Sequence, residues 1–588
     1  MWILSEVKMK KLLIVLLISF AAFVFVSCGV SDDEEGETVV NDEDSSGSGG
    51  NGGGNGGGGN GNGDGEQTDS DEEPVNGGGI YVTCTPGETL PCYEGPSGTD
   101  GVGICKAGYK ECVEDGTDWS ECRDQILPSP EICGNGIDEN CDGEDMTPET
   151  AVDYDGDGYT YCTGDCCETG WEPGCSGTDS PERINPGAFE MKDNYFDDNC
   201  NGEVDEVEHC DAGLSLSIGD YEGNAEKLAK AMGVCAGLIS AEIGLAGEPI
   251  TEMIDARPDR CNQPSGDGQT TCTTEQSPRL SREKPYYESD YQTFAVTNMF
   301  GTMMKPEDGS NMLAVLSTGQ WNSPTQNESI ATLGAGDMQT ASKLPSDWLN
   351  MMPGCAVPKA PSCGGQAPQD GLTNQCAGKS DSDIPVGQDP IMLTLKMKVP
   401  ANARAFEFNL FFMSIEYPGT VCDDRNYNDF FIALLDSTYN EKNPNAEYKN
   451  PYDKNLAKDE LGNPVGVDLA PAGLFKACNP NCGSGGLIGS LTNSINQWGF
   501  CTGDELLNGT GFGTEGKSGL IACQEGHGGT GWLRVVGNVE PNEEITLRLA
   551  LWEQGTVGYG PDHSWDSTVV LDGFTWLPTP KKPGVTPK

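Results

Sequence analysis

The stretch Ile545-Thr-Leu-Arg-Leu-Ala-Leu-Trp552 decides the fold class of this 588-residue chain. Its apolar residues Ile545, Leu547, Leu549 and Leu551 occupy every second position. Successive side chains of a β-strand point to opposite faces of the sheet, so a period of two places these four side chains on one face. The stretch therefore predicts a strand from a sheet with one buried face.

Six other runs also have the composition of strands, and connections rich in Gly, Pro and Asn separate them. They are Met312–Ser317, Ile391–Val399, Ala405–Ser414, Asp429–Leu435, Trp532–Val536 and Thr568–Trp576. Leucine, alanine and methionine at helical spacing predict one short helix from Asn224 to Gly233. We predict a mainly β chain, in which residues 221–577 form a β-sandwich or jelly-roll-like domain after a small loop-rich region stabilised by disulfides and cations.

The N-terminal residues have the order of a secretory signal. Lys8, Lys10 and Lys11 precede an uncharged apolar run over residues 12–26 that is short for a membrane-spanning helix. Ser27-Cys28 after this run resembles a bacterial lipobox, which predicts a signal at residues 1–28 and lipid attachment at Cys28. Ordinary cleavage that leaves a free cysteine is the alternative, and translation can start at Met1 or Met9.

Residues 29–79 are rich in glycine, asparagine, serine and acidic residues and contain no lysine or arginine. Such a segment cannot bury enough apolar surface to fold. We predict a disordered acidic linker that holds the rest of the chain away from the membrane.

Cysteine usage indicates export. The chain has 25 cysteines, and 24 are left for pairing once Cys28 carries a lipid. Disulfides persist outside the cytosol. Residues 80–130 hold an odd number of cysteines, so one of them must pair further along the chain; these are Cys84, Cys92, Cys105, Cys112 and Cys122. We expect short strands and turns joined by disulfides there.

A formal net charge of −59 argues against nucleic acid as a partner. Acidic residues at this density favour solubility and the binding of cations.

Residues 131–208 concentrate the metal-type sequence. Asp153, Asp155 and Asp157 stand at positions 1, 3 and 5 of a loop like that of an EF-hand, with the carbonyl of Tyr159 as the next ligand. Gly164 occupies position 12, where an EF-hand has its closing glutamate, so we expect Asp165 to close the loop instead. Oxygen-only ligands favour Ca²⁺ over copper or another transition metal.

Two copies of an Asp/Asn-Cys-Asp/Asn-Gly pattern flank this loop, at residues 133–143 and 192–202. They supply weaker metal candidates, which are Asp138, Asp142, Asp197 and Asp198. The alternative for the whole block is a set of Asx turns that cap their own backbone without a metal.

The block resembles the metal-binding motif of the MopE type, found in exported bacterial proteins. That family has Asp-x-Asp-Gly-Asp-Gly-Tyr, an Asp-Cys-Asp cluster, Pro-Gly-Ala and a closing Asp-Asn-Cys-Asp-Gly-x-x-Asp-Glu. The corresponding residues here are Asp153–Tyr159, Asp165, Pro186–Glu190 and Asp198–Glu206. The chain departs from the family at Cys167, where Asp is usual, and at Lys192, where the first copy has Cys133.

Residues 221–577 resemble the choice-of-anchor L domain, a β-rich module of bacterial surface proteins. The segments that carry the resemblance are Met312–Gly319, Asn402–Pro418, Tyr427–Leu435, Gly531–Val536, Val539–Glu553 and Asp566–Trp576. Within it, Glu416, Asp429, Asp562 and Asp566 fall at strand ends, and we hypothesise that they converge on a structural calcium. The alternative is that Asp429 and Asp566 cap turns while Glu416 forms an exposed ion pair.

No enzymatic signature is present. His527 and His563 lie in no nucleophile elbow and in no zinc-helix motif, so we identify no catalytic residues and expect no enzyme. The favoured function is a calcium-stabilised, lipid-anchored protein of the cell envelope, at the outer membrane or cell surface, that displays the sandwich for adhesion or for binding a glycan or protein. The alternative is a secreted hydrolase or binding protein of polysaccharides.

Overall fold

The structure is a computed structural model of the chain. It describes residues 84–172, 174–207, 209–217, 220–247, 292–307, 309–321, 329–330, 341–355, 357, 360–365, 375–379, 384–417, 421–422, 429–479, 501–513, 527–554 and 566–588. The predicted signal, Cys28 and the linker lie outside these residues, as does Asp562. Among the described residues, no helix is long and apolar enough to cross a membrane.

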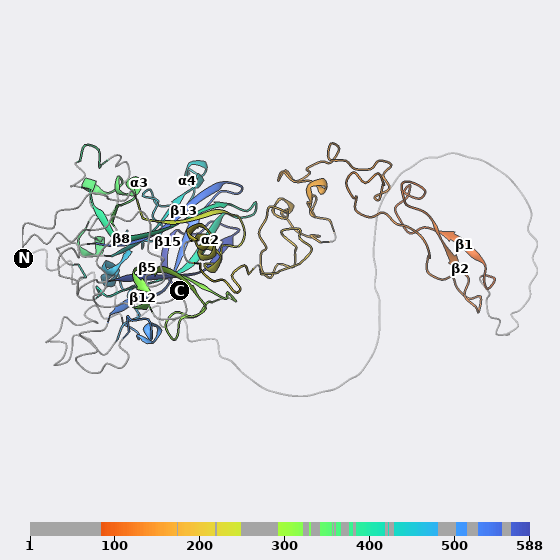
Figure 1. The fold of residues 1–588 in the computed structure, drawn as a ribbon. Helices are drawn as coiled ribbons and strands as arrows, with labels where there is room; N and C mark the ends of the chain where they lie inside the picture. The colour runs from red at the N-terminus through yellow and green to blue at the C-terminus, as the bar shows by residue number, and fades with distance from the viewer. Residues whose placement is uncertain are drawn as a thin grey trace, which may run out of the picture. The chain divides into compact units, whose positions relative to one another are not determined.

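Two antiparallel sheets form a β-sandwich (Figure 1). The first, sheet I, has the strand order β11 (Val465–Gly466), β10 (Phe430–Asp436), β13 (Glu544–Glu553), β8 (Val386–Lys398) and β3 (Leu238–Gly244), and β7 (Ala341–Lys343) also pairs with β8. The second, sheet II, has the order β15 (Gly584–Pro587), β12 (Gly528–Asn538), β9 (Ala405–Ser414), β14 (Ser567–Leu577), β5 (Leu313–Trp321) and β4 (Gln292–Thr297), and β6 (Ser329–Ile330) also pairs with β5.

The mainly β sandwich predicted from the sequence is confirmed. All seven predicted strands are present, as β5, β8, β9, β10, β12, β13 and β14. From β8 to β10 and again from β12 to β14, consecutive strands alternate between the two sheets, as in a jelly roll. Strand β15 follows residue 577, so sheet II continues past the end that we expected for the domain.

The alternation in β13 has the predicted result on one face. Ile545, Leu547, Leu549 and Leu551 lie in the main core between the sheets, with Phe406, Phe408, Leu410 and Phe412 of β9. The opposite face of β13 is also buried near its end, because Ala550 and Trp552 pack with Trp348, Phe430 and Ile432. The expectation of a single buried face therefore holds for only part of this strand.

Short helices lie around the sandwich. Helix α2 (Tyr221–Ala231) begins three residues before the predicted start, because Asp220 caps it by accepting a hydrogen bond from the backbone of Gly223. Helices α3 (Ser346–Leu349) and α4 (Tyr439–Lys442) are single turns. Further 3₁₀ turns are Tyr161–Thr163, Pro181–Arg183, Pro353–Cys355, Pro361–Cys363, Val467–Ala472 and Glu505–Leu507.

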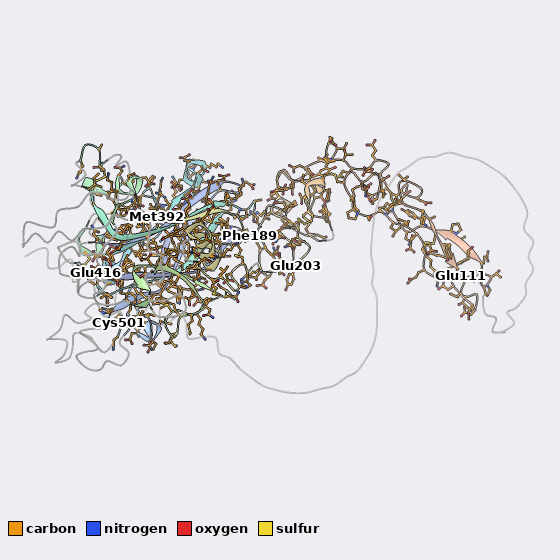
Figure 2. The ribbon with its side chains drawn as sticks, viewed as in Figure 1. Glu111, Phe189, Glu203, Met392, Glu416 and Cys501 are labelled. Atoms are coloured by element: carbon orange, nitrogen blue, oxygen red, sulfur yellow. A yellow bond between two sulfur atoms is a disulfide. The ribbon has the colours of Figure 1, made fainter. Side chains whose placement is uncertain are left out.

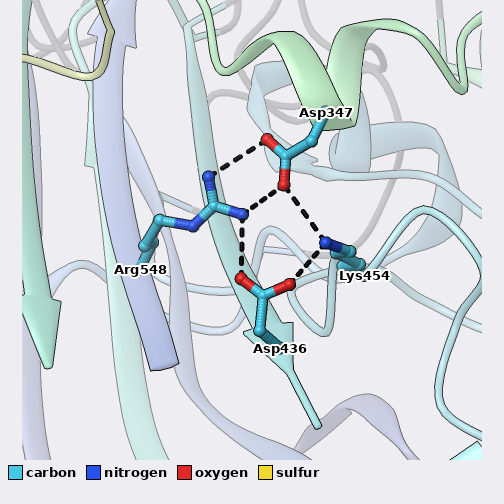
Figure 3. Close-up of polar contacts among 4 residues, drawn as sticks. All are labelled: Asp347, Asp436, Lys454 and Arg548. Carbon is cyan, nitrogen blue, oxygen red and sulfur yellow. Dashed lines mark hydrogen bonds and ion pairs between the residues drawn. The ribbon is translucent and has the colours of Figure 1, made fainter. Parts of the chain in front are cut away.

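An ionic network joins α3 to sheet I (Figure 3). Arg548 of β13 forms a two-pronged contact with Asp347 of α3, in which Nη1 lies 3.1 Å from Oδ1, and its Nη2 also lies 3.3 Å from Oδ2 of Asp436. Lys454 contacts both aspartates from the other side. Since Arg548 is only 16 % exposed, this network neutralises a guanidinium that would otherwise be buried without a partner.

The region before the sandwich has little regular structure. Strands β1 (Thr89–Cys92) and β2 (Gly108–Glu111) form a two-stranded sheet, as expected for residues 80–130. Disulfides take the place of a large apolar core here. The pairs before the sandwich are Cys84–Cys112, Cys92–Cys122, Cys105–Cys141, Cys133–Cys162, Cys166–Cys200 and Cys167–Cys175.

Cys105–Cys141 confirms that one cysteine of the first segment pairs further along the chain. The remaining described pairs are Cys210–Cys235, Cys355–Cys376, Cys363–Cys422 and Cys478–Cys501. Every cysteine in the described part of the chain is therefore in a disulfide, as the even number of 24 predicted.

Specific contacts attach the metal-type block to the sandwich. Phe189 donates its backbone N–H to Oδ1 of Asn402 (2.9 Å) and accepts from Nδ2 of the same side chain (2.8 Å). Further on, Asp211 accepts hydrogen bonds from Ser310, Asn311 and Met312. The disulfide Cys210–Cys235 lies next to this second contact. The block is thus held to the sandwich directly at Phe189 and, just after its end, through Asp211.

Candidate metal centre

The centre is built on the glycine-rich loop that follows Val152. Asp153 accepts hydrogen bonds from the backbone of Gly156 (2.6 Å) and Gly158 (3.1 Å), which turns the chain back on itself. Gly156 and Gly158 have φ of +84° and +97°, a conformation that favours glycine. The turn places Asp155 and Asp157 beside Asp153.

Four carboxylates of this loop share one arrangement of their oxygens. One oxygen accepts a backbone N–H: that of Asp155 from Asp157 (3.1 Å), Asp157 from Tyr159 (2.7 Å), Asp165 from Cys167 (2.8 Å) and Glu168 from Tyr154 (2.8 Å). The second oxygen of each is buried and has no hydrogen-bond donor among the described residues. Buried oxygens are normally satisfied, so four unsatisfied oxygens in one loop point to a cation as their partner.

The spacing of these groups suits a cation. Ligand oxygens of Asp153, Asp155 and Asp157 lie within 4.8 Å of one another, and so do those of Asp155, Asp165 and Glu168. An ion with metal–oxygen distances of about 2.4 Å can touch oxygens up to roughly twice that distance apart. Because Asp155 belongs to both sets, one ion beside it can contact carboxylates from both.

Burial and mutual repulsion disfavour the charged carboxylates when no cation is present. Burial raises the pKa of Asp155 to about 6, with a further contribution from the charges of Asp157 and Glu168. Burial likewise raises the pKa of Asp165 to about 7, and the charges of Asp157, Glu168 and Asp155 add to it. A bound cation would reverse this balance by compensating the negative charge.

Cross-links and close packing hold the loop in place. Cys133–Cys162 ties it to the first flanking copy, and Cys166–Cys200 ties it to the second. Gly187 lies so close to Tyr159 that a Cβ built on it would stand 2.3 Å from the phenolic oxygen. The Pro-Gly-Ala phrase therefore needs its glycine to accommodate this ring.

The predicted site residues of the loop are brought together. Asp153, Asp155, Asp157 and Asp165 all belong to the acidic cluster. Gly164, at position 12, has φ of +96° and ends a 3₁₀ turn, so Asp165 is the residue placed to face the loop. Tyr159 takes part through its backbone N–H, which donates to Asp157, and through its ring.

Glu168 is a member of the cluster that the sequence analysis missed. It lies 15 residues after Asp153, outside any EF-hand spacing, and reaches the loop because its carboxylate accepts the backbone N–H of Tyr154. Its position directly after Cys166-Cys167 was the available signal, since paired cysteines fix the chain there.

The weaker candidates of the flanking copies mostly bind backbone. Asp138 accepts from the backbone of Asp142 and Gly143, and Asp197 accepts in the same way from Asn201 and Gly202. Asp142 accepts from the backbone of Glu144. Asp142 thus forms an Asx turn, which was the alternative to metal binding, whereas Asp138 and Asp197 accept from the fourth and fifth residues after them.

Asp198 differs from the other three. It is fully buried, and its Oδ2 accepts from Met191 and Asn194, while Oδ1 has no donor among the described residues. Burial raises its pKa. It is the residue of the flanking copies whose surroundings come closest to those of the central loop.

Two other groups of potential ligands contain sulfur, namely Cys167, Glu172 and Cys175, and Cys363, Cys422 and Asp468. Their cysteines are paired as Cys167–Cys175 and Cys363–Cys422. A metal binds the thiolate form of cysteine, so neither group offers a sulfur ligand in this structure.

A cleft of about 960 Å³ lies where the second flanking copy faces sheet II. Its lining includes Glu190, His209, Arg534, Phe574 and Trp576. Phe574 and Trp576 are less than a tenth exposed, so they do not form an open aromatic platform of the kind that stacks on sugars.

The candidates in the sandwich lie at one end of it. Glu416, Asp429 and Asp566 are all buried there, and Glu416 is connected to Asp429 by a hydrogen bond. The alternative of an exposed ion pair for Glu416 does not fit its complete burial. Asp562 lies outside the described residues.

One protein family matches part of the chain. Its description is "Putative metal-binding motif", its name combines copper binding with MopE, and it matches residues 128–145 and 178–206. The matched segments contain the two flanking copies, and the Asp153–Glu168 loop lies between them. No curated protein and no solved structure matches the chain.

Proposed function

We propose that this chain is an exported, lipid-anchored protein of the bacterial cell envelope in which calcium makes the metal-type block rigid. The observation that carries the proposal is the set of four buried carboxylate oxygens in the central loop, from Asp155, Asp157, Asp165 and Glu168, which have no donor among the described residues. All are hard oxygen ligands, which Ca²⁺ prefers.

Calcium is preferred over copper because of the donor set. The name of the matching family refers to copper, yet the central cluster contains neither a histidine nor a thiolate. Cu²⁺ favours imidazole nitrogen, and Cu⁺ favours sulfur. A cluster of five carboxylates instead offers the high coordination number that calcium requires.

The anchoring part of the proposal rests on the signal-like N-terminus with Cys28, the charged linker and the complete pairing of the described cysteines. The resemblance to the choice-of-anchor L domain supports a role of the sandwich in adhesion or ligand binding. In this arrangement the block stiffens the connection between the linker and the sandwich, and residues beyond 221 meet the partner.

The test is a metal analysis of the purified full chain, followed by chelation and titration with Ca²⁺ and Cu²⁺ in parallel. We expect calcium to bind and to raise the melting temperature, and EDTA to reverse the change. Unchanged melting in EDTA together with no heat of calcium binding would exclude calcium. Radiolabelled fatty acid incorporation, lost in Cys28→Ser, tests the lipid.

A glycan array combined with a hydrolysis assay tests the displayed sandwich. Binding without turnover supports a display function. Turnover would instead support the alternative of a polysaccharide hydrolase.

A further inference from the structure

Acidic residues from both sheets meet at one end of the sandwich because of the strand register. In sheet I, Phe430 of β10 pairs with Trp552 of β13, so the next position outward places Asp429 opposite Glu553. In sheet II, Ser414 of β9 pairs with Ser567 of β14, and the next position outward places Ile415 opposite Asp566. The backbone N–H of Ile415 donates to the carbonyl oxygen of Asp566 (3.1 Å).

Hydrogen bonds connect these strand ends across the two sheets. Ser567 donates its hydroxyl to Oδ2 of Asp429 (2.6 Å), and the backbone of Asp429 donates to Oε2 of Glu416 (3.1 Å). We call Glu416, Asp429, Glu553 and Asp566 the sandwich-end cluster. The metal-type block is attached to the sandwich at Phe189. Figure 2 shows Glu416 at the opposite end of the sandwich from Phe189.

Glu553 is the residue that points to a ligand. It is 1 % exposed, and neither of its carboxylate oxygens accepts a hydrogen bond from an N–H group of a described residue; the polar group beside it is the carboxyl of Asp566. Within the described part of the chain, no lysine or arginine forms an ion pair with Glu553, Asp429 or Asp566. Burial raises the pKa of Glu553 well above its usual value, and the charges of Asp566, Asp429 and Asp389 raise it further.

The backbone leaves room for this group of acids. A Cβ built on Gly319 of β5 would stand 2.4 Å from Oδ2 of Asp566, so any larger residue there would displace that carboxylate. Asp429 also accepts from the backbone of Gln554 (3.2 Å), which holds its other oxygen. The acids are therefore oriented by the fold although they repel one another.

We propose that Asp429, Glu553 and Asp566 bind a second calcium ion, with Glu416 orienting Asp429. The ligands are again oxygen-only, and a divalent cation supplies the positive charge that this buried group needs. Among the described residues, no three of these carboxylates lie as close together as those of the central loop. The ion must draw them together, so this site binds calcium more weakly than the loop does.

The two sites lie far apart. The block contacts Asn402, just before β9, and the sandwich-end cluster begins at Glu416, just after it. Ten strand residues at about 3.3 Å each separate the attachment point at Asn402 from the sandwich-end cluster by roughly 30 Å. A substitution at one site should therefore leave calcium binding at the other site unchanged.

Calorimetric titration of the chelated full chain with Ca²⁺ tests the proposal, using Glu553→Gln, Asp165→Asn and the double variant. We expect each single variant to bind one calcium fewer than the wild-type chain and the double variant to bind two fewer. Glu544→Gln is the matched control, because Glu544 is exposed at the other end of β13 and pairs with Lys396. It should bind as the wild type does.

Melting temperature gives a second readout that does not depend on counting ions. In EDTA, Glu553→Gln should melt at or above the wild type, because it removes a buried acid that is crowded by Asp429 and Asp566. In saturating calcium, Glu553→Gln should melt at a lower temperature than the wild type. Asp566→Asn repeats the test if Glu553→Gln does not fold.

Calcium stoichiometry and affinity equal to wild type in a folded Glu553→Gln or Asp566→Asn chain would overturn the second site. The loop site would still stand if Asp165→Asn lost its calcium in the same experiment. Unchanged calcium binding in these variants would mean that the carboxyls of the sandwich-end cluster only share protons with one another and bind no ion.

Discussion

Asp165 and Asp138 show how the same side chain serves two purposes in similar sequences. Both lie in loops rich in Asp, Asn, Gly and Cys. Both oxygens of Asp138 accept hydrogen bonds from backbone N–H groups. Only Oδ1 of Asp165 does so, and its buried Oδ2 has no hydrogen-bond donor among the described residues. The sequence pattern alone does not distinguish the two cases.

Substitution of each aspartate by asparagine separates these purposes. Asp165→Asn should weaken calcium binding at the loop by about 100-fold or more, the upper end of what residues outside the ligand shell cost, so that the titration no longer counts this ion. Asp138→Asn should leave calcium affinity unchanged, although the single asparagine oxygen can keep only one of the two backbone hydrogen bonds and the turn should become less stable. Calorimetric titration of both variants measures the difference, and equal losses would show that Asp138 is also a ligand.

Gly187 is a second residue where a small change should have a specific effect. Gly187→Ala would place a methyl group against the Tyr159 ring, and such overpacking typically costs about 1–3 kcal/mol. We expect a lower melting temperature and weaker calcium binding, because Tyr159 follows the ligand loop directly. Gly177→Ala is the control: Gly177 has a φ of +97°, so an alanine there is strained, but no atom lies within 4 Å of its Cβ. It should lower stability without changing calcium affinity.

At the scale of elements, α3 is a single turn, too short to be stable alone, and it is held by packing and charge. Trp348 packs on Trp552, and Asp347 pairs with Arg548 and Lys454. Burial alone would raise the pKa of Asp347, but hydrogen bonds and charges from Arg548 and Lys454 outweigh it and hold the pKa below its usual value.

Arg548→Met should therefore destabilise the sandwich in a pH-dependent way. Because the folded pKa of Asp347 is depressed, the stabilisation is present above the unfolded pKa of about 3.9 and is lost as the pH falls through the lower folded value. We expect a loss on the order of 2 kcal/mol at pH 7 that shrinks below about pH 4. Urea unfolding at several pH values measures it.

Lys396→Met provides the comparison for this prediction, because its ion pair with Glu544 is about half exposed on both sides. Its cost should stay below about 1 kcal/mol at every pH. A loss in Arg548→Met that did not change between pH 7 and pH 3 would show that Arg548 acts through packing rather than charge.

At the scale of the whole molecule, the block and the sandwich divide mechanical support from recognition. The Asp153→Ala, Asp155→Ala and Asp157→Ala triple variant should loosen the block, measured as faster proteolysis between residues 131 and 208. Ligand binding by residues beyond 221 should remain. A folded triple variant that lost its ligand would place recognition in the block or in the cleft beside it.

Much of the fold could be read from local patterns. Apolar alternation identified β13 and the other long strands, because their inward side chains must be apolar whatever their neighbours are. The short edge strand β15 and the outer strands β3 and β4 were missed, since an edge strand needs fewer apolar residues and depends on its pairing partner.

The sequence by itself determined the strand periodicity, the disulfide-compatible cysteine number and the alternating aspartates of the central loop. These are local properties, set by the geometry of one strand, one loop or one count. Only the tertiary structure decided that Glu168 joins the loop and that Glu553 faces Asp429 at the end of the sandwich. Those contacts arise from disulfide pairing and strand register, which bring together residues that no sequence spacing relates.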